Sequence, residues 1–259
     1  MGKVLNHVKS IDKIFFNKKL LKFYENKKLN DLEKKLGYKI SIFYNSESDN
    51  LFSKLCDKYG SDKGNSNKEL AVYPWPAHTY SDLYTRLFSH CRQNIKFVFE
   101  CGLGTNNELI PSNMTSQGKP GASLRVWRDY FPNAQIIGAD IDKQVLFNED
   151  KIKTFYVDQT SSESVCSMWN LIDVKNFDLM VDDGLHTFEA GINLFINSIH
   201  RLSDFGIYLI EDIGRELRQR YFLYFKNPKL VEKFSIEYIS LERPNLTLGD
   251  NGLILIRKK

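Results

Sequence analysis

From residue 96 onward, short apolar runs alternate with longer segments in which apolar residues recur every three or four positions. The apolar runs predict strands at 96–102, 134–140, 152–158, 177–183 and 205–212. The periodic segments predict helices at 121–131, 161–172 and 187–202. Strands that are separated by helices pair in parallel through right-handed crossovers. The pattern therefore predicts an α/β fold with a mostly parallel sheet and helices on both faces.

The end of the chain departs from this alternation. The apolar runs at 234–242 and 252–259 are separated only by the turn-rich link RPNLTLGDN. Such a link holds no helix, so we expect these two strands to form an antiparallel hairpin. The predicted sheet then has seven strands.

The first 40 residues differ from the rest in charge. They hold eleven lysines and four acidic residues, which gives +7, so the remainder carries −3 of the chain's net +4. Apolar residues such as Ile11, Ile14 and Phe15 recur at near-helical intervals and predict amphipathic helices with lysine-rich outer faces. A nucleic-acid arm and a packing or homo-oligomerisation arm are the alternatives. Arginine and base-stacking patterns are missing, which favours the second and predicts no nucleic-acid partner.

We therefore divide the chain into a basic helical N-terminal extension, residues 1–56, and one globular domain, residues 57–259. The four cysteines show no CxxC pairing or regular spacing, so neither a zinc site nor a disulfide framework is expected. No apolar run reaches the length of a membrane span, and the first residues lack the apolar core of a secretory signal. These features favour a cytoplasmic location.

Acidic residues close five consecutive predicted strands. They are Glu100, Asp140, Asp158, the pair Asp182 and Asp183, and the pair Glu211 and Asp212. Any one of them could be a helix cap or a solvated strand end. In an open parallel sheet, however, ligands bind at the carboxyl ends of the strands, and five such ends are hard to explain by packing.

The first of these strand ends suggests a nucleoside-containing cofactor. Gly102 and Gly104 let the backbone come close to a ligand, and Asp140 is placed to accept hydrogen bonds from ribose hydroxyls. A nicotinamide enzyme would show GxGxxG running into a helix, whereas residues 105–120 intervene here. The carboxylate of Glu100 disfavours a pyrophosphate and suits an ammonium or sulfonium group. The 105–120 loop is either a substrate lid or a packed or disordered insertion.

These residues carry a resemblance. The motifs FECGLG, GADID, YVDQT, VDDGLHT and YLIEDI, in this order and spacing, resemble class I S-adenosylmethionine-dependent methyltransferases with a Rossmann-like fold. More narrowly, they resemble the metal-dependent sugar O-methyltransferases typified by mycinamicin VI and macrocin O-methyltransferases, with cephalosporin-hydroxylase-like proteins as relatives. The resemblance covers about residues 57–259 and includes the lead-in DKYGSDKG.

The resemblance implies a cofactor site. Glu100, Gly102 and Gly104 would border the methionine part of S-adenosylmethionine, Asp140 would bind its ribose, and Asp158 with Gln159 would flank its adenine. Lys63 and Tyr80 would close over the cofactor.

A metal site is expected next to it. Asp183, Glu211 and Asp212 end neighbouring strands and could converge on one Mg²⁺ or Mn²⁺ ion, with Asp182 as the alternative to Asp183. His186 is either a structural histidine or, as the resemblance implies, the general base. A sugar hydroxyl is a very weak acid, so a metal that lowers its pKa and a base that takes its proton would make it a nucleophile toward the methyl group.

The acceptor is less determined. Arg215, Arg218 and Arg220 follow the acidic pair and either bind the diphosphate of a nucleotide-linked sugar or form a solvated helix face. We expect a bacterial enzyme that methylates a capsular sugar such as a nucleotide-activated heptose, with an antibiotic glycoside next. A nicotinamide-dependent oxidoreductase and a non-catalytic sugar-binding relative are the rivals from other classes.

Overall fold

The computed structural model describes residues 39–43, 50–64, 73, 75–242 and 249–259. The strands are β1 (Lys39–Phe43), β2 (Phe97–Cys101), β3 (Gln135–Asp140), β4 (Asn148–Glu149), β5 (Ile152–Tyr156), β6 (Phe177–Asp182), β7 (Leu202–Ile210), β8 (Phe234–Glu242) and β9 (Gly252–Lys258). The helices are α2 (Leu51–Tyr59), α3 (Tyr80–Phe88), α4 (Ala122–Tyr130), α5 (Ser162–Asn170), α6 (Phe188–Ser198), α7 (Arg215–Phe225) and α8 (Pro228–Lys233). Two short 3₁₀ turns cover Lys143–Val145 and Ile199–Arg201.

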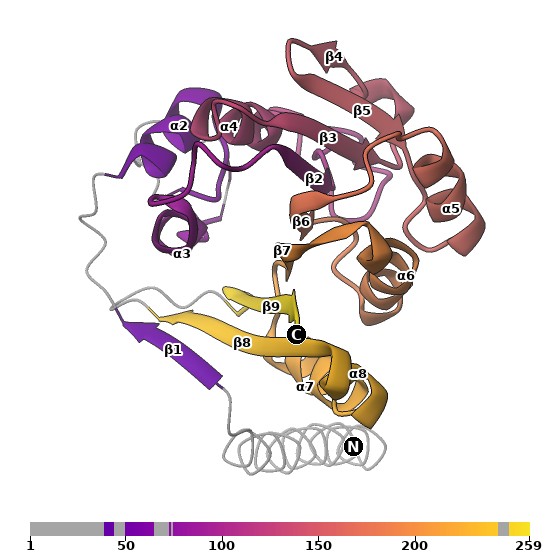
Figure 1. Cartoon of the computed structure of the whole chain (residues 1–259). Helices are drawn as coiled ribbons and strands as arrows, with labels where there is room; N and C mark the ends of the chain where they lie inside the picture. The colour runs from indigo at the N-terminus through magenta and orange to yellow at the C-terminus, as the bar shows by residue number, and fades with distance from the viewer. Residues whose placement is uncertain (1–38, 44–49, 65–72, 74, 243–248) are drawn as a thin grey trace, which may run out of the picture. The chain divides into compact units, whose positions relative to one another are not determined.

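The strands form one sheet in the order β1-β8-β9-β7-β6-β2-β3-β5-β4 (Figure 1). Strands β5, β3, β2, β6 and β7 pair in parallel, as predicted. The predicted antiparallel hairpin of β8 and β9 is confirmed, and β9 lies between β8 and β7 and is antiparallel to both. The described sheet has nine strands instead of seven, because β1 and the two-residue β4 carry no clear apolar run.

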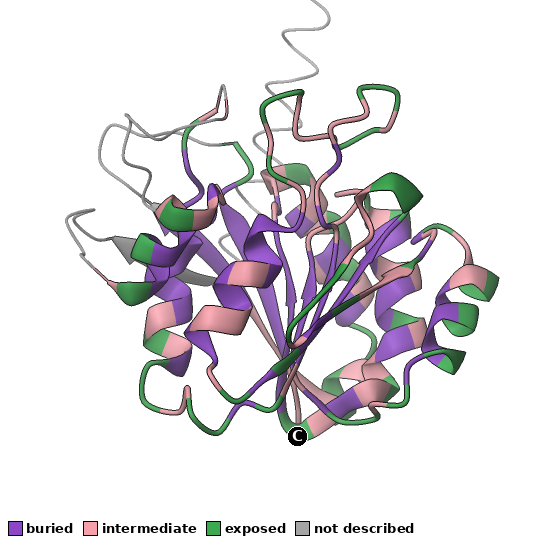
Figure 2. Cartoon of the chain, turned by 90° about the horizontal axis from the view of Figure 1, so that it is seen from above, coloured by how far each residue is buried: buried purple, intermediate pink, exposed green. Residues whose placement is uncertain are grey.

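Two layers of helices cover the sheet, and buried strands fill the space between them (Figure 2). Successive strand residues point to opposite faces. Val98 therefore packs in one core with α2, α3 and α4, while Phe99 packs in the other with α5, α6 and α7.

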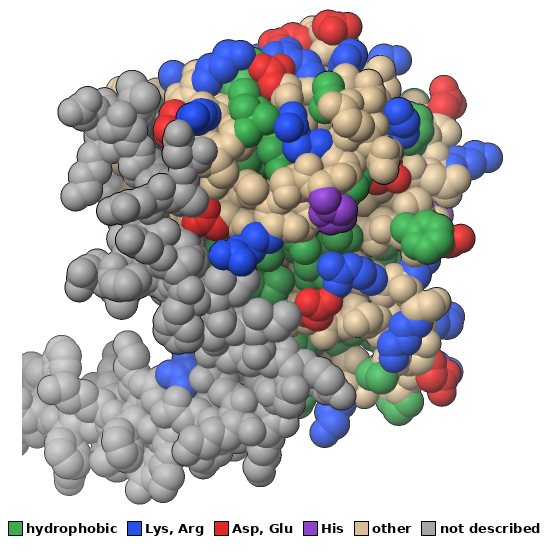
Figure 3. All heavy atoms as spheres, turned by 60° about the vertical axis from the view of Figure 1, so that its left-hand side comes forward, with side chains coloured by type: hydrophobic (Ala, Val, Ile, Leu, Met, Phe, Trp, Pro, Cys, Tyr) green, Lys and Arg blue, Asp and Glu red, His purple; other side chains and the backbone are tan. Residues whose placement is uncertain are grey.

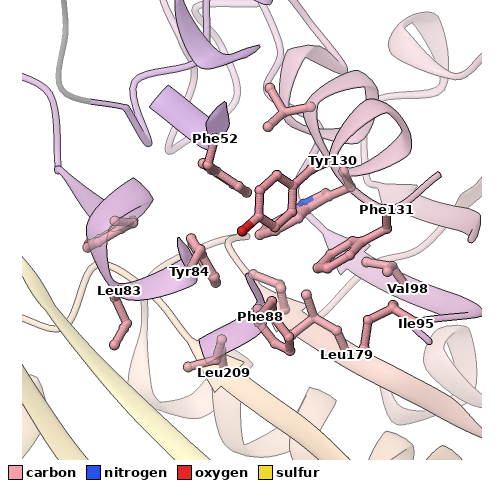
Figure 4. Close-up of a cluster of buried hydrophobic side chains, with 14 of the residues drawn as sticks. Phe52, Leu83, Tyr84, Phe88, Ile95, Val98, Tyr130, Phe131, Leu179 and Leu209 are labelled. Atoms are coloured by element: carbon pink, nitrogen blue, oxygen red, sulfur yellow. The ribbon is translucent and has the colours of Figure 1, made fainter. Parts of the chain in front are cut away.

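The first core is rich in aromatic rings. Phe52 of α2 contacts Tyr84 of α3 and both Trp127 and Tyr130 of α4, with ring centroids 4.9–5.2 Å apart. Figure 4 shows Phe52, Tyr84 and Tyr130 in this cluster of buried side chains, which also includes Val98 of the sheet. Helix α2 is thus part of the folded core.

The last described residues of the predicted N-terminal extension belong to this core. Phe52, Leu55 and Cys56 lie before residue 57 and are buried, and the compact folded unit takes in residues 40–259. The folded domain therefore begins earlier than the boundary expected from the sequence. The predicted lysine-rich helices fall on residues 1–38, outside the described residues.

Side-chain caps fix where several helices begin. Ser161 accepts a hydrogen bond from the Ser164 amide at the start of α5, and Thr187 accepts one from the Ala190 amide at the start of α6. Among the described residues, no helix is both long and apolar enough to span a membrane. The four cysteines are free thiols.

Candidate functional site

A cavity of about 580 Å³ lies at the carboxyl ends of the parallel strands. Its wall includes residues 101–105 after β2, 140–141 after β3, 157–160 after β5, 183–186 after β6, and Asp212 after β7. The strand ends predicted to form a ligand site therefore do converge on one hollow.

Two glycines shape the loop that follows β2. Gly102 has φ 97° and Gly104 has φ 76°, conformations that favour glycine. A Cβ atom would lie 1.9 Å from the Asp183 carbonyl oxygen at Gly102 and 1.6 Å from the Met114 sulfur at Gly104. Both glycines line the cavity. They are required because Asp183 and Met114 lie too close to their Cα atoms to leave room for a side chain.

Asp140 is held in the cavity wall by backbone amides. Its Oδ2 accepts a hydrogen bond from the Leu103 amide at 2.7 Å, and its Oδ1 accepts one from the Asp142 amide at 2.8 Å. Burial raises the pKa of Asp140, although these amides oppose the shift. Asp158 lines the cavity at the end of the neighbouring strand, where its Oδ1 accepts from the Thr160 amide at 2.9 Å. Both acids therefore line the cavity, at the ends of neighbouring strands.

Gln159 lines the cavity but its side chain serves the loop after β6. Its amide nitrogen donates to Asp182 Oδ1 at 2.6 Å, and its oxygen accepts from the Leu185 amide at 2.9 Å. Asp182 is only 3% exposed, and burial raises its pKa to about 6. Asp183, by contrast, lines the cavity. Of the two neighbouring acids, Asp183 is the one placed to bind a ligand.

Asp183, His186 and Asp212 form the outer group, at the cavity. Their potential ligand atoms all lie within 4.8 Å of one another. His186 Nε2 is 3.5 Å from Asp212 Oδ2 and 3.9 Å from Asp183 Oδ1. Two carboxylates and an imidazole are donors that suit a divalent cation.

Tyr80, the first residue of α3, and His78, two residues before it, hold Asp212 in place. The Tyr80 hydroxyl donates to Asp212 Oδ1 at 2.7 Å, and His78 Nδ1 lies 3.3 Å from the same oxygen. Tyr80, expected to close over the cofactor, is 1% exposed and orients Asp212 instead, although it also borders the cavity. Sequence reasoning missed His78, and its place in HTY, two residues before Tyr80, is the signal that could have found it.

His186 has a left-handed backbone, with φ 55°. Burial lowers the pKa of its imidazole, but the carboxylates of Asp212, Asp183 and Asp182 raise it by a larger amount, so the pKa lies above its ordinary value. The side chain is 27% exposed and faces the cavity. The predicted catalytic residue therefore has access to a ligand.

Lys63 lies at the centre of an inner group made of Glu100, Asp183 and Glu211. Its ammonium donates to Asp183 Oδ2 at 2.5 Å and to Glu211 Oε2, and lies 3.3 Å from Glu100 Oε1. The side chain is 3% exposed. Lys63 borders the cavity, but its ammonium is engaged by protein carboxylates, which differs from the expected contact with the cofactor.

Glu211 and Asp212 turn in opposite directions. Glu211 is 1% exposed, with its Oε2 bound by Lys63 and its Oε1 bound by the Tyr84 hydroxyl. Asp212, with φ 55°, reaches the outer group. The expected ligand set of Asp183, Glu211 and Asp212 is therefore divided between the two groups, with Asp183 shared.

Glu100 does not line the cavity, whereas the resemblance implies that it borders the cofactor. It is fully buried, and its Oε2 accepts hydrogen bonds from Ser123 at 2.8 Å and from the Trp127 indole at 3.0 Å. Burial raises the pKa of Glu100 to about 7, against the opposing charge of Lys63.

The 105–120 loop forms one wall of the cavity. The Met114 amide donates to the Thr105 carbonyl at 2.8 Å, and the Asn106 side chain donates to the Thr115 carbonyl at 2.6 Å. Ser112 reaches the Leu185 carbonyl in the loop after β6 at 3.2 Å. The loop is therefore packed on itself and on the loop after β6, and it borders the site.

An aromatic pair near the acids was not found from the sequence. Trp75 lines the cavity, donates from its indole to Asp62 at 2.8 Å, and stacks on Tyr73 with ring centroids 5.1 Å apart. The Tyr73 hydroxyl in turn donates to the Gly60 carbonyl at 2.8 Å. The run YPWP is the sequence signal for this aromatic wall.

The arginines of α7 do not line the cavity. Arg218 is buried, and Arg220 pairs with Glu189 and lies 4.3 Å from the Phe188 ring of α6. The diphosphate site expected from Arg215, Arg218 and Arg220 is therefore not at this cavity. The reason is that Arg218 is buried in the first turn of α7, while Arg220 links α7 to Glu189 and Phe188 of α6.

No family model matches the chain, but curated proteins do. It is 28% identical over 159 residues to 8-demethyl-8-alpha-L-rhamnosyl tetracenomycin-C 2'-O-methyltransferase of Streptomyces olivaceus, covering 61% of this chain and 36% of that protein. It is 29% identical over 136 residues to mycinamicin VI 2''-O-methyltransferase of Micromonospora griseorubida, covering 52% and 32%. The chain thus spans about a third of the length of the curated relatives it matches.

Solved structures share the fold. The MycE methyltransferase of the mycinamycin pathway, in complex with Mg and SAH, superposes with a TM-score of 0.57 at 20% identity, covering 80% of this chain and 54% of that one. The same enzyme in complex with Mg, SAH and mycinamycin VI gives the same score. The predicted class I methyltransferase fold is confirmed, and so is the resemblance in sequence to sugar O-methyltransferases.

Proposed function

We propose that the chain is a metal-dependent O-methyltransferase that moves a methyl group from S-adenosylmethionine to a sugar hydroxyl. The observation that carries this proposal is the cavity, which joins Asp140 on one side to Asp183, His186 and Asp212 on the other. Its relatives by sequence are named sugar O-methyltransferases, which supports the same reaction.

S-adenosylmethionine, when bound, supplies a methyl group that is activated by the positive sulfur. Asp140 has both oxygens fixed by backbone amides, and its remaining lone pairs can accept hydrogen bonds from two ribose hydroxyls. Asp158 and the apolar side chains of Ile141 and Val157 line the same part of the cavity and suit an adenine ring. The glycine loop after β2 borders the remaining space.

The outer group fits a Mg²⁺ or Mn²⁺ ion, whose charge would lower the pKa of a coordinated sugar hydroxyl. Asp183 and Asp212 would hold the ion, and Tyr80 and His78 keep Asp212 oriented toward it. We assign the general base to His186, because it is the imidazole beside these acids and it faces the cavity.

We propose two classes of sugar as the acceptor of the methyl group. The relatives named above act on antibiotic glycosides, whereas the sequence favours a nucleotide-activated capsular heptose. Trp75 offers an apolar face beside the acids, against which a sugar ring of either class could pack. We place the reaction in the cytoplasm. On the face shown in Figure 3, acidic and basic side chains are interspersed, which does not favour a nucleic-acid partner.

The test is a calorimetric titration of the full chain with S-adenosylmethionine, with and without Mg²⁺, followed by transfer of labelled methyl to panels of nucleotide-linked heptoses and rhamnosyl glycosides. We expect cofactor binding and metal-dependent labelling of one panel. Cofactor binding without any labelling would favour the non-catalytic relative, and absence of cofactor binding would overturn the proposal.

A further inference from the structure

One of the chain's three tryptophans lines the cavity. Trp75 borders it, whereas Trp127 and Trp169 are 0% and 2% exposed and lie in the two cores of the fold. An aromatic ring in a cavity wall is a binding surface for a ligand with apolar area. Trp75 is also distinct from the residues expected to bind the cofactor and the metal.

The indole of Trp75 is held in place on two sides. Tyr73 stacks on it at an interplanar angle of 27°, with ring centroids 5.1 Å apart, and the Tyr73 hydroxyl donates to the Gly60 carbonyl at 2.8 Å. The indole N–H donates to Asp62 Oδ2 at 2.8 Å. Because this N–H already has an acceptor, Trp75 offers carbon surface to a ligand in the cavity. A ring that is fixed in advance loses little conformational freedom when a ligand packs on it.

Trp75 lies on the side of the cavity where the acceptor would bind. The carbonyl of its partner Asp62 accepts the His78 amide at 2.9 Å, and His78 Nδ1 lies 3.3 Å from Asp212 Oδ1. Asp212 follows β7, whereas the acids expected to bind the cofactor lie at the ends of β3 and β5, which β6 and β2 separate from β7 in the sheet. A ligand on Trp75 is therefore next to the outer group.

Polar groups lie beside this aromatic surface. Ser61 and Asp62 line the cavity, and the Asp62 carboxylate has further lone pairs besides the one that accepts from Trp75. A pyranose ring has matching chemistry. The C–H bonds on one of its faces pack on an aromatic ring, whose face is negative, and the equatorial hydroxyls at its edge can donate to a carboxylate.

We infer that Trp75 and Asp62 form the acceptor subsite and select the sugar by the configuration of its ring. A pyranose with an unbroken C–H face packs on Trp75 and donates a hydroxyl to Asp62, whereas an axial hydroxyl on that face holds the ring away from the indole. The inference rests on the proposed function, because it gives a specificity-determining role to two residues of the site where methyl transfer would occur.

The first experiment follows tryptophan fluorescence of the full chain, saturated with S-adenosylhomocysteine and Mg²⁺. The probes are the methyl glycosides of L-rhamnose and D-mannose and their epimers at single ring carbons. Since the other two tryptophans are buried, a change in emission reports on Trp75. We expect a saturable change with one glycoside, at a Kd about tenfold or more below that of its epimers. Emission that changes with none of these glycosides would overturn the inference.

The second experiment compares Trp75→Ala and Trp75→Phe in transfer of labelled methyl to the glycoside panel. We expect Trp75→Ala to raise the acceptor KM by about 10- to 100-fold and to lose the preference among epimers, with kcat and cofactor affinity kept within about threefold. Trp75→Phe keeps a ring against Tyr73 and should restore most of that preference. Phe205→Ala, at a fully exposed position of β7, is the control. An acceptor KM and epimer preference equal to those of the control, or a loss of cofactor affinity in their place, would contradict the inference.

Asp62→Asn covers the case in which Trp75→Ala does not fold. Asn keeps an oxygen that can accept from the indole but removes the charge, so we expect the acceptor KM to rise by about 3- to 10-fold. An unchanged KM in this variant would remove Asp62 from the subsite and overturn the inference.

The inference and the proposed function fail in different ways. A chain whose Trp75 emission responds to one glycoside, but which transfers no methyl group, would overturn the proposed function and leave the sugar subsite. A chain that methylates a sugar with the same KM and epimer preference in Trp75→Ala as in wild type would do the reverse.

Discussion

Single residues at the strand ends have distinct surroundings, and these decide what each can bind. Asp140 keeps contact with the cavity while two backbone amides fix its orientation. Asp182, equally close to a strand end, is buried and bound by Gln159. The difference leaves Asp140 accessible to a ligand in the cavity, whereas Asp182 is bound within the protein.

Replacing Asp140 by Asn should weaken S-adenosylmethionine binding by about 1 to 3 kcal/mol, because an amide accepts fewer and weaker hydrogen bonds from ribose. Isothermal titration measures the change. Asp150→Asn, in the exposed turn before β5, is the matched control and should bind as wild type does. Affinity of Asp140→Asn equal to that of the control would remove Asp140 from the cofactor site.

Replacing His186 by Asn should reduce methyl transfer by about 10² to 10⁴-fold, because the general base is lost. Asn also tolerates the left-handed backbone at this position, so the fold is kept. Initial rates at saturating cofactor give the effect, with His90→Asn at an exposed position as control. If the variant folds, binds cofactor and still turns over at the wild-type rate, His186 is not the base.

Sequence reasoning located these acids because their positions follow from topology. Asp140, Asp158, Asp183 and Asp212 each lie at the end of a parallel strand or within two residues after it, and the carboxyl ends of such strands meet at one edge. The inward turn of Glu211 could not be read in this way. It depends on Lys63 and Tyr84, which lie 148 and 127 residues earlier in the chain.

At the scale of elements, polar contacts around Asp129 bind helix α2 to helix α4. Asp129 of α4 accepts hydrogen bonds from the Tyr59 hydroxyl at 2.5 Å, from Lys58 at 2.9 Å and from Arg128 at 2.9 Å. Burial raises the pKa of Asp129, but the hydrogen bonds from Tyr59, Lys58 and Arg128 outweigh it and bring the pKa down to about 2. This network fixes α2 against α4.

Asp129→Asn should lower the free energy of unfolding at pH 7 by about 1 to 2 kcal/mol, a figure reduced for partial exposure to solvent. Because the pKa of Asp129 is lower in the folded state than in the unfolded state, its stabilisation is present above about pH 4 and is lost as the pH falls through 2. Urea unfolding at a series of pH values should show the gap between wild type and variant closing over that range. The exposed Asp173→Asn is the control, and a gap that stays constant with pH would refute the assignment.

The elements were predicted where an apolar run was long enough to be buried. Strands β2, β3 and β6 have runs of buried residues, whereas β4 consists of Asn148 and Glu149, both exposed. Strand β1 lies within the N-terminal extension, residues 1–56, for which the sequence predicts helices. Local patterns cannot distinguish such edge strands, because their pairing is decided by a distant neighbour.

For the whole molecule, methyl transfer should depend on a divalent cation. A chelator should abolish turnover and added Mg²⁺ or Mn²⁺ should restore it, because the acids at the cavity need a cation to bring an acceptor oxygen into reactive form. Rates of label transfer before and after dialysis against chelator provide the measurement. Full activity in chelator would show that the outer group acts without metal.

The position of β9 within the sheet has a consequence for how the molecule is made. Strand β9 follows the other described strands in sequence, yet it lies between β7 and β8. Its Gly252 carbonyl accepts a hydrogen bond from the amide of Ile213, the residue after Asp212. During synthesis, Asp183 and Asp212 therefore leave the ribosome well before the strand that supports Asp212. The aromatic core of α2, α3 and α4 can form before β9 is made, whereas the support of Asp212 has to wait for it. Truncation of β9 is therefore expected to disturb the outer group more than the aromatic core.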